Sequence, residues 1–485
     1  MPDIILTTLN AKYIHASLGL RYLFANMGKL QDRTKIIEFD INQRSIDIAE
    51  LILNQSPKII GIGVYVWNVA LVTELVEIIK AINPNVCIIL GGPEVSYFDD
   101  LPNVVEKADF VIAGEADTEF ALLCERILLG QRPLTKLIKA EQPALDSLNL
   151  PYKYYTDSDL EHRVIYVESS RGCPFGCEFC LSAIDRNLRF FPLEKFLVEL
   201  KGLINRGVRT IKFVDRTFNI QGSAALKVLQ FLKENLDRPV FIHFEVIPDR
   251  LTIEQIELAA SLPMATIQFE AGIQTLNEEV CARIGRNQNS EKALDNLKYI
   301  VNKTNILLHA DLIAGLPGEN LASFAESFNK LAEIWPHDIQ VGILKRLRGA
   351  LIKRHSVDFS MVFNPGPPYQ ILKNNLMSFE DLQRIQRFAR LWDLVGNHSR
   401  FRNATGLIFL NSTDKFGSFM DFTDWMHRKV GRFYGIALHR LAGLIMEYLT
   451  KEKSICSTVV ADALWQDYKA IGHSSPPPFL KDFVG

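Results

Sequence analysis

The sequence predicts an α/β protein with two successive series of strands and helices, followed by a mostly helical region. Short apolar runs rich in β-branched residues recur up to residue 345, and helical patterns lie between most of them. Strands that alternate with helices form βαβ units, so each series should give a parallel sheet covered by helices. A chain of 485 residues is also too long for one hydrophobic core, which favours two or three domains.

The first domain is expected over residues 1–135. Its strands should be the apolar runs 3–9, 35–40, 59–66, 86–90 and 108–113. Ligands of parallel sheets bind beyond the carboxyl ends of the strands. Gly91, Gly92 and Gly114 stand at such ends, and glycine allows the backbone to approach a bulky ligand closely.

A polar, proline-containing linker is expected over residues 136–162, and a second domain over residues 163–350. The strands of this domain should lie at 164–169, 210–215, 240–246, 264–270, 306–313 and 338–345. Its helices should lie near 193–205, 223–235, 252–261, 290–303 and 321–334. Six βα repeats predict a partial parallel barrel, in which functional groups gather at the carboxyl ends of the strands.

A helical C-terminal domain is expected over residues 351–485. Ser378 and Asp381 are spaced as a helix cap, and the residues that follow repeat at helical spacing. The apolar members of that repeat are Leu382, Ile385, Phe388, Trp392 and Val395. Such a face lines either a ligand pocket or a helical core, and the core is the favoured interpretation.

The composition sets limits on location and partners. Hydrophobic residues make up 48% of the chain and charged residues 23%, which is typical of a globular protein. A net charge of −2 gives no general attraction to nucleic acids, and no apolar run approaches the length of a membrane span. We therefore expect a cytoplasmic protein in which the scattered cysteines are reduced, buried thiols: Cys87, Cys124, Cys281 and Cys456.

The remaining three cysteines form the most informative motif of the chain. Cys173, Cys177 and Cys180 follow a CxxxCxxC spacing in a loop directly after the first expected barrel strand. Three thiolates at short spacing suit a [4Fe–4S] cluster and leave one iron without a protein ligand. A structural zinc site would need a fourth ligand, usually from paired CxxC spacings, and no such pair is present. Three buried structural cysteines are the other alternative, but a polar loop with glycine and proline disfavours it.

Polar residues also occur at the ends of the expected barrel strands, at Asp215, Glu245, Glu270, Gln274, Asp311 and Lys345. A polar residue in an apolar strand is costly unless it is paired or functional. Each one alone is equally well explained by a structural hydrogen bond. Their common position around the cysteine loop predicts a functional site there.

With both halves considered, residues 1–345 resemble the cobalamin-binding-domain radical S-adenosylmethionine (SAM) proteins, often called class B. The cysteine loop carries the resemblance, together with the segments 17–20, 61–64, 91–93, 114–119, 213–218, 270–274 and 311–319. The resemblance implies a flavodoxin-like (Rossmann-like) B12-binding domain followed by a partial (β/α)6 radical SAM barrel. The C-terminal part looks like an uncharacterised domain added to one branch of these proteins.

The resemblance also implies roles for individual residues. Cys173, Cys177 and Cys180 would hold the cluster, and SAM would occupy the open iron and be cleaved with an electron from flavodoxin or ferredoxin. Phe179 would lie against the adenine and Asp215 near the amino group, while the ribose and carboxylate would be contacted by Glu245, Gln274 and Asp311. Arg346 would pair either with the SAM carboxylate or with a surface carboxylate.

Cobalamin is the second cofactor that the resemblance implies, at Ser17, Gly19, Tyr65, Gly91, Gly92 and Gly114. Many B12 domains supply a cobalt-ligating histidine in a DxHxxG loop. The stretch around His15 has no aspartate two places earlier, and its Gly19 comes one position late. We therefore expect His15 to lie near the corrin without coordinating cobalt, so that the lower face meets a side chain such as Tyr65, or solvent.

The leading functional hypothesis is methylation of an unactivated carbon in an unknown small-molecule or peptide substrate. A first alternative is cyclisation or rearrangement with the same cofactors. A second is tRNA methylthiolation, but such enzymes normally carry another three-cysteine set, which this sequence lacks. The last is a non-catalytic iron–sulfur or B12-binding protein, which would not need the acidic strand ends or the segment 315–319.

Overall fold

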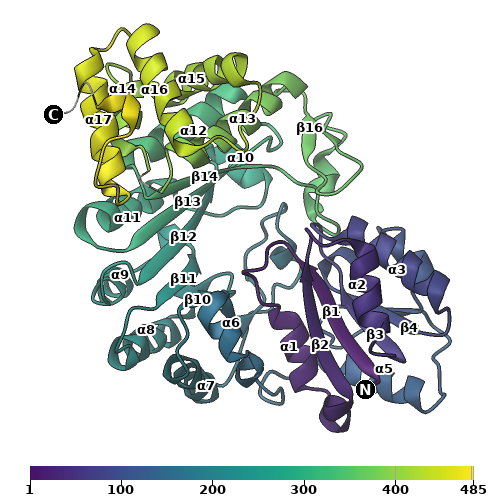
Figure 1. Cartoon of the computed structure of the whole chain (residues 1–485). Helices are drawn as coiled ribbons and strands as arrows, with labels where there is room; N and C mark the ends of the chain where they lie inside the picture. Colours follow the sequence, from purple (N-terminus) through teal and green to yellow (C-terminus); the bar gives the residue numbers. More distant parts are fainter. Residues whose placement is uncertain (399, 482, 484–485) are drawn as a thin grey trace.

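The computed structural model describes residues 1–398, 400–481 and 483, and Figure 1 shows an N-terminal domain beside a second α/β domain and a C-terminal group of helices. The first domain contains one parallel sheet with the order β2-β1-β3-β4-β5-β6. Its strands are β1 (Ile4–Asn10), β2 (Thr34–Asp40), β3 (Ile59–Gly63), β4 (Cys87–Gly91), β5 (Phe110–Ala113) and β6 (Leu137–Lys139). The strand order reverses between β1 and β3, and ligands of such sheets bind at the crevice beyond that point. The flavodoxin-like prediction is confirmed.

Helices cover both faces of this sheet because its central strands are apolar on both sides. All seven residues of β1 are buried. Helices α2 (Ser45–Leu53) and α3 (Val69–Ile82) pack on one face through residues such as Ile48 and Val72. Helices α1 (Leu18–Ala25) and α5 (Glu119–Leu128) pack on the other through Leu20 and Phe120, and α4 (Val104–Lys107) adjoins α3.

The segment 136–162 is more ordered than a linker. It supplies β6, which pairs with β5, and α6 (Asp157–His162), which begins with a capping box from Thr156 to Asp159. The buried hydroxyl of Tyr152 lies 3.0 Å from both the amide nitrogen and the carbonyl oxygen of Glu168. A strand of three residues and a helix of six are too short to show a period, so the polar composition of the segment concealed them.

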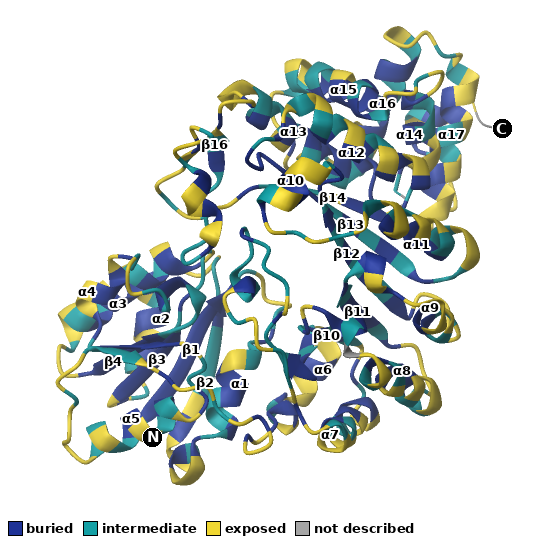
Figure 2. Cartoon of the chain, turned by 180° about the vertical axis from the view of Figure 1, so that it is seen from behind, coloured by how far each residue is buried: buried dark blue, intermediate teal, exposed yellow. Residues whose placement is uncertain are grey.

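The second domain contains the predicted six-stranded parallel sheet, in the order β14-β13-β12-β11-β10-β7. The strands are β7 (Ile165–Val167), β10 (Thr210–Phe213), β11 (Phe241–Val246), β12 (Ile267–Gln274), β13 (Leu307–Ala314) and β14 (Asp338–Ile343). Among the described residues β7 and β14 each pair with one strand only, so the sheet is open. The helices are α7 (Leu193–Asn205), α8 (Ser223–Asn235), α9 (Ile253–Ala260), α10 (Glu278–Arg283), α11 (Ser290–Lys303) and α12 (Leu321–Ile334). Figure 2 shows α7, α8, α9 and α11 along the outer side of the sheet.

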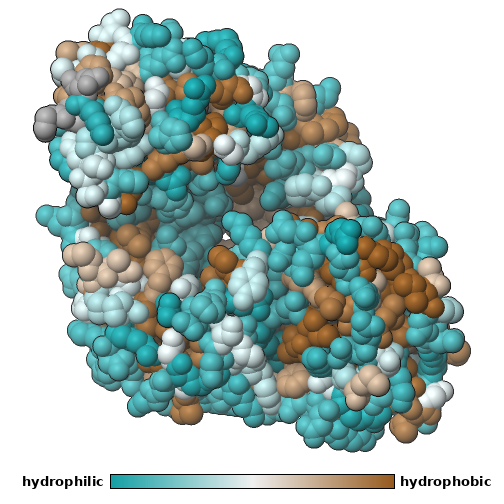
Figure 3. Space-filling view, viewed as in Figure 1, coloured by the Kyte–Doolittle hydropathy of each residue, from teal (hydrophilic) through white to brown (hydrophobic). Residues whose placement is uncertain are grey.

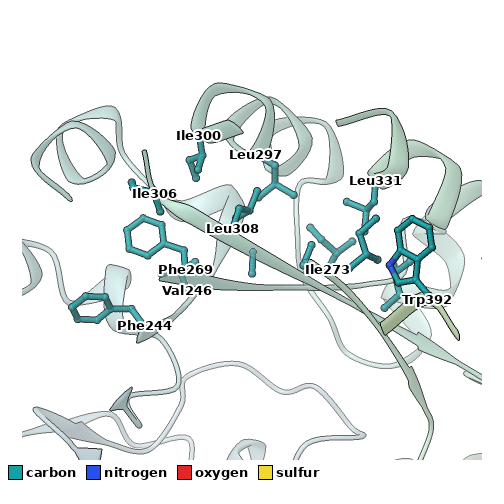
Figure 4. Packing of buried hydrophobic residues seen from close by; sticks show 14 of the residues in the cluster. Phe244, Val246, Phe269, Ile273, Leu297, Ile300, Ile306, Leu308, Leu331 and Trp392 are labelled. Carbon is teal, nitrogen blue, oxygen red and sulfur yellow. The ribbon is translucent and has the colours of Figure 1, made fainter. Parts of the chain in front are cut away.

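Alternation along the barrel strands separates an apolar outer face from a polar inner face. In β12 the buried residues alternate with half-buried ones over the whole strand. Phe269 and Ile273 pack toward the helices, where Figure 4 shows them near Leu297 and Leu331. The intervening residues are Gln268, Glu270, Gly272 and Gln274. Because side chains alternate across a strand, these residues face the inner, concave side of the sheet.

The C-terminal region packs onto the barrel instead of standing apart from it. After the short strands β15 (Val362–Phe363) and β16 (Ile371–Lys373) it contains α13 (Phe379–Val395), α14 (Arg402–Ile408), α15 (Lys415–Val430), α16 (Leu438–Lys451) and α17 (Ser457–Ala470). Ser378 and Asp381 form the predicted capping box. Phe388 and Trp392 each lie 5.0 Å, between ring centroids, from Phe328 of α12. The apolar face of α13 is therefore core, as expected. No helix in the described parts of the chain is long and apolar enough to span a membrane.

Candidate functional site

The cysteine loop leaves β7 through β8 (Ser170–Arg171), at the carboxyl edge of the open barrel. Gly172 has φ +89°, and a Cβ there would lie 2.3 Å from the carbonyl oxygen of Asn187, so only glycine fits this turn. Cys173 is buried and Cys177 and Cys180 are partly exposed; all three are free thiols. Among the other cysteines, Cys456 differs from the expectation, because it is exposed just before α17.

A cavity opens beside the three cysteines on the concave side of the barrel. Four of the residues predicted to contact SAM line it together with the cysteines: Phe179, Glu245, Gln274 and Asp311. Arg216 and Arg286 also line the cavity, and Nη1 of Arg286 lies 3.7 Å from Sγ of Cys177. Burial raises the pKa of the Cys177 thiol, and the Arg286 guanidinium opposes this rise and favours the thiolate, which is the form that binds iron.

Gln274 has an unusual position at the end of β12. The pairing of β12 with β13 shifts register between Gly272 and Gln274, and Gln274 has φ +70°. Such a bulge re-aims a side chain at the rim of a barrel. Its Oε1 atom is buried and has no hydrogen-bond partner in the described structure. An unpaired buried acceptor that faces a cavity is suited to a donor group on a ligand.

Asp215 and Arg346 do not line the cavity. The carboxylate of Asp215 is buried and accepts hydrogen bonds from the amide of Ser169 at 3.0 Å and from the hydroxyl of Ser170 at 2.6 Å. It thereby fixes the backbone that leads into the cysteine loop, and its predicted contact with SAM stays a prediction. Arg346 pairs with Asp100 of the first domain, at 3.8 Å between Nη1 and Oδ2.

A second cavity lies at the carboxyl edge of the first sheet. Five of the residues predicted to contact cobalamin line it: Gly19, Tyr65, Gly91, Gly92 and Gly114. Glu168 and Arg171 of the second domain also line it. Ser17 lies outside the lining, where its hydroxyl caps α1 by accepting from the amide of Leu20 at 3.3 Å. The ends of β3 and β4 therefore face the segment that leads into the cysteine loop.

An aromatic pair stands next to this cavity. The rings of Tyr65 and Trp67 stack at 4.5 Å between centroids, and Nε1 of Trp67 donates to the carbonyl oxygen of Leu9 at 3.1 Å. His15 lies outside the cavity lining, with Nδ1 2.7 Å from the hydroxyl of Tyr166. Trp67 was not predicted as a site residue, because a tryptophan after a strand has no spacing that marks a ligand.

Arg171 joins the two domains electrostatically at the edge of the second cavity. Its guanidinium lies 2.7 Å from Glu115 and 2.8 Å from Asp117, both in the first domain, and 2.9 Å from Glu168. Burial raises the pKa of Glu168 to about 7, against the opposing effect of Arg171. Neither Glu168 nor Arg171 was predicted as a site residue, although both precede the cysteines in the same short segment.

The inner face of the barrel carries further polar and charged residues that contact the cavity-lining Glu270 and Asp311. Nε2 of His243 lies 2.7 Å from Glu270, and Lys212 lies 3.2 Å from the same carboxylate. Burial alone would lower the pKa of His309, but hydrogen bonds with Asp311 and Asp338 raise it to about 10. The two histidines were not predicted, because a single histidine in a strand is usually a structural residue.

Comparisons with known families match three parts of the chain. The model described as "Radical SAM superfamily" matches residues 167–331, and the model described as "B12 binding domain" matches residues 4–123. A third, described as "Protein of unknown function (DUF4080)", matches residues 357–482. This chain contains a radical SAM domain and a B12-binding domain. Its C-terminal region corresponds to the family of unknown function.

Individual relatives agree with this assignment. The chain is 26% identical over 332 residues to the uncharacterized methyltransferase PH0819 of Pyrococcus horikoshii, covering 62% of this chain and 70% of that protein. It is 26% identical over 333 residues to the cobalamin-dependent radical SAM methyltransferase TokK of Streptomyces tokunonensis, covering 59% of this chain but only 47% of TokK. The same fold occurs in the solved structure of the cobalamin-dependent SAM radical enzyme OxsB with aqua-cobalamin and SAM bound, with a TM-score of 0.63. The two sequences are 14% identical, and the match covers 97% of this chain and 79% of that one.

The residues present fit the cofactors that the radical SAM domain and the B12-binding domain imply. Three free thiols share one loop, and Arg286 stands beside one of them. No group of three or more Cys, His, Asp or Glu within the described ranges suits a single metal ion, whereas a cluster distributes its thiolates over several irons. On the B12 side, Gly92 has φ +102°, and a Cβ there would lie 2.7 Å from the carbonyl oxygen of Val64. Only glycine therefore fits this turn, which lines the second cavity together with Gly91 and Gly114.

Proposed function

We propose that this protein is a cobalamin-dependent radical SAM methyltransferase that acts on an unactivated carbon of a small molecule or peptide. The observation that carries the proposal is that both sites adjoin one segment of the chain, the one that leads into the cysteine loop. The cysteine loop opens onto a polar cavity of the barrel, and the segment that leads into this loop closes a second cavity on the B12-binding domain. Two cofactors held on either side of one short segment suit a reaction that uses both on one substrate atom.

In this proposal Cys173, Cys177 and Cys180 hold the [4Fe–4S] cluster. SAM is bound by Phe179, Asp215, Glu245, Gln274 and Asp311, and cobalamin by Ser17, Gly19, Tyr65, Gly91, Gly92 and Gly114. When bound, the cluster and SAM supply a radical that removes hydrogen from substrate, and cobalamin supplies a transferable methyl group. The protein's own contribution is to orient these groups and to exclude water from the space between them.

The inner face of the barrel supports a polar or charged substrate. Lys212, His243 and Glu270 form a connected polar group on that face, and His309 is held in its charged form by Asp311 and Asp338. Fixed charges of both signs favour a substrate that offers hydrogen bonds in return, and they oppose the burial of a long hydrocarbon chain. This favours a polar metabolite or peptide over a lipid.

The proposal includes an electron donor and a location. Radical SAM proteins need an external electron, and we propose flavodoxin or ferredoxin as its source. All cysteines of the described chain are free thiols, including the exposed Cys456, which suits a reducing cytoplasm.

The test is an anaerobic assay of the reconstituted protein with SAM labelled in its methyl group, cobalamin, a reductant and a small-molecule extract of the source organism. Methyl transfer predicts 5′-deoxyadenosine, S-adenosylhomocysteine and a product that carries the label. Deoxyadenosine with an unlabelled product would favour cyclisation or rearrangement. In a parallel reaction with added tRNA, labelled sulfur-methyl groups in the tRNA would favour methylthiolation. The absence of deoxyadenosine in both reactions would favour a non-catalytic binding protein.

A further inference from the structure

The segment that connects the barrel to the C-terminal helices touches both candidate cofactor loops. We call residues 346–369 the strap. It is closed at its base, where Lys345 pairs with Gln370 and the amide of Arg346 donates to the carbonyl oxygen of Tyr369 at 3.0 Å. In Figure 1 the chain around β16 reaches from the barrel toward the N-terminal domain.

On the B12 side, the strap holds the buried carboxylate of Glu94. This residue follows Gly91, Gly92 and Pro93, directly after β4. The Tyr369 hydroxyl donates to Oε1 of Glu94, and Nε of Arg348 donates to the same oxygen at 2.9 Å. The Arg348 guanidinium also donates to the carbonyl oxygen of Asp100 at 2.9 Å.

The strap backbone adds to this contact. Gly349 has φ +82°, and a Cβ at this position would lie 2.3 Å from the ring of Tyr97. The strap and the loop after β4 are therefore packed so closely that no side chain fits between them at this point.

On the cluster side, the same strap holds a second buried carboxylate. Glu178 stands between Cys177 and Phe179 in the cysteine loop, and its side chain is almost wholly buried. Nε2 of His355 lies 2.8 Å from Oε2 of Glu178, and Arg354 donates to Oε1. The amide of Ile352 donates to the carbonyl oxygen of Glu178 at 2.9 Å, so backbone and side chain are both fixed.

We propose that the strap is a positioning element that sets the cysteine loop and the loop after β4 relative to each other. Each loop contributes one buried carboxylate, and the strap pairs each carboxylate with an arginine and a second side chain. The second side chain is Tyr369 for Glu94 and His355 for Glu178. A buried charge that loses its partners is strongly destabilising. The position of the strap therefore determines the position of each loop. Displacement of the strap at one loop is therefore transmitted to the other. The inference rests on the proposed function only in that the two loops hold cofactors.

Hydrogen–deuterium exchange of the protein with its reconstituted cluster tests this coupling. Glu178→Ala should increase exchange in peptides covering 92–100 as well as in the cysteine loop, and Glu94→Ala should increase it in peptides covering 176–185. Asp424→Asn is the matched control, because it breaks an ion pair with Arg384 between α13 and α15 and should change neither loop. Exchange that rises only in the loop that carries the substitution would overturn the proposal.

Tyr369→Phe keeps the test decisive if the alanine variants fail to fold. It removes one hydroxyl whose hydrogen bonds, among the described residues, go to Glu94 and Arg348, yet it should still raise exchange in residues 176–185. Spectroscopic readouts separate positioning from a general loss of stability. Glu94→Ala should alter the electron paramagnetic resonance of the reduced cluster, and Glu178→Ala should weaken hydroxocobalamin binding by about fivefold or more. Wild-type protein that binds no corrinoid would remove cobalamin from the proposed function, and the exchange experiment would still decide the role of the strap.

Discussion

The hydroxyl of Thr275, just past the end of β12, donates a hydrogen bond to one carboxyl oxygen of Glu319, and the other oxygen has no partner in the described structure. Glu319 is fully buried, and burial raises its pKa to about 8 although the Thr275 hydrogen bond acts in the opposite direction. At neutral pH the group is therefore mainly protonated in the folded protein.

Glu319 should make stability depend on pH. Because its pKa in the folded protein is above the unfolded value, its contribution is complete below about pH 4.5 and is lost as the pH rises through about 8. The loss is of the order of a few kcal/mol, since one pKa unit corresponds to about 1.4 kcal/mol. Urea unfolding at pH 6 and pH 9 measures it. Glu319→Gln should reduce the difference in unfolding free energy between pH 6 and pH 9, whereas the exposed Glu291→Gln should leave this difference unchanged. An equal difference in the wild-type protein and both variants would contradict the assignment.

Iron binding should depend on the three clustered cysteines alone. We expect about four irons per chain after anaerobic reconstitution, and close to none in the variant in which Cys173, Cys177 and Cys180 are all alanine. Cys124→Ala is the control, because this thiol is buried in the first domain. Iron analysis and the absorbance of the cluster provide the measurement. Full iron content in the triple variant would be incompatible with this site.

Gln274 should contribute directly to SAM affinity. Gln274→Ala removes the unpaired buried acceptor and should weaken binding by about tenfold, the order expected for one hydrogen bond. Anaerobic calorimetry of the reconstituted protein measures the dissociation constant. Gln230→Ala on the exposed side of α8 should have no effect. An unchanged constant for Gln274→Ala would show that the ligand does not reach this group.

Gly92→Ala should disrupt the loop after β4. The residue has φ +102°, and its new Cβ would lie 2.7 Å from the carbonyl oxygen of Val64, so both strain and a clash oppose the change. We expect loss of corrinoid binding and a destabilisation of about 1–3 kcal/mol. Gly443→Ala in α16 is the matched control, because no atom lies within 4 Å of its Cβ and a helical alanine stabilises by about 0.5–1 kcal/mol. Unfolding free energies that shift in the same direction for both variants would argue against the clash.

His15 should not coordinate cobalt. The residue lies outside the lining of the second cavity, and the stretch around it departs from the DxHxxG spacing. Electron paramagnetic resonance of the Co(II) protein should therefore show no axial nitrogen splitting, and His15→Ala should leave the spectrum unchanged. Nitrogen splitting that disappears in this variant would establish the opposite.

Long periodic elements were predictable from the sequence, and short or polar ones were not. The helices at 193–205, 223–235, 290–303 and 321–334 were predicted with their observed bounds, because each spans several turns with a clear apolar face. Helix α10 and strand β6 were missed, since six and three residues are too few to show a period.

The candidate site was predictable where spacing or position marked it. The cysteines, Phe179, Glu245, Gln274 and Asp311 do line one cavity. The unpaired oxygen of Gln274 was not predictable, because it depends on a shift of register that only the folded sheet defines. Arg171 was missed for a similar reason: its partners Glu115 and Asp117 are distant in sequence and approach it only when the two domains pack.

The aromatic contact between α12 and α13 has a consequence for how this chain can be divided. The buried residues of the barrel and of the C-terminal helices belong to one continuous apolar cluster, whereas two faces of the first sheet have clusters of their own. A protein cut after residue 350 would expose Phe328 and its neighbours on α12 to water. The barrel and the helices that follow it should therefore melt as one cooperative unit, and shortened versions of the protein should precipitate rather than yield an isolated catalytic half.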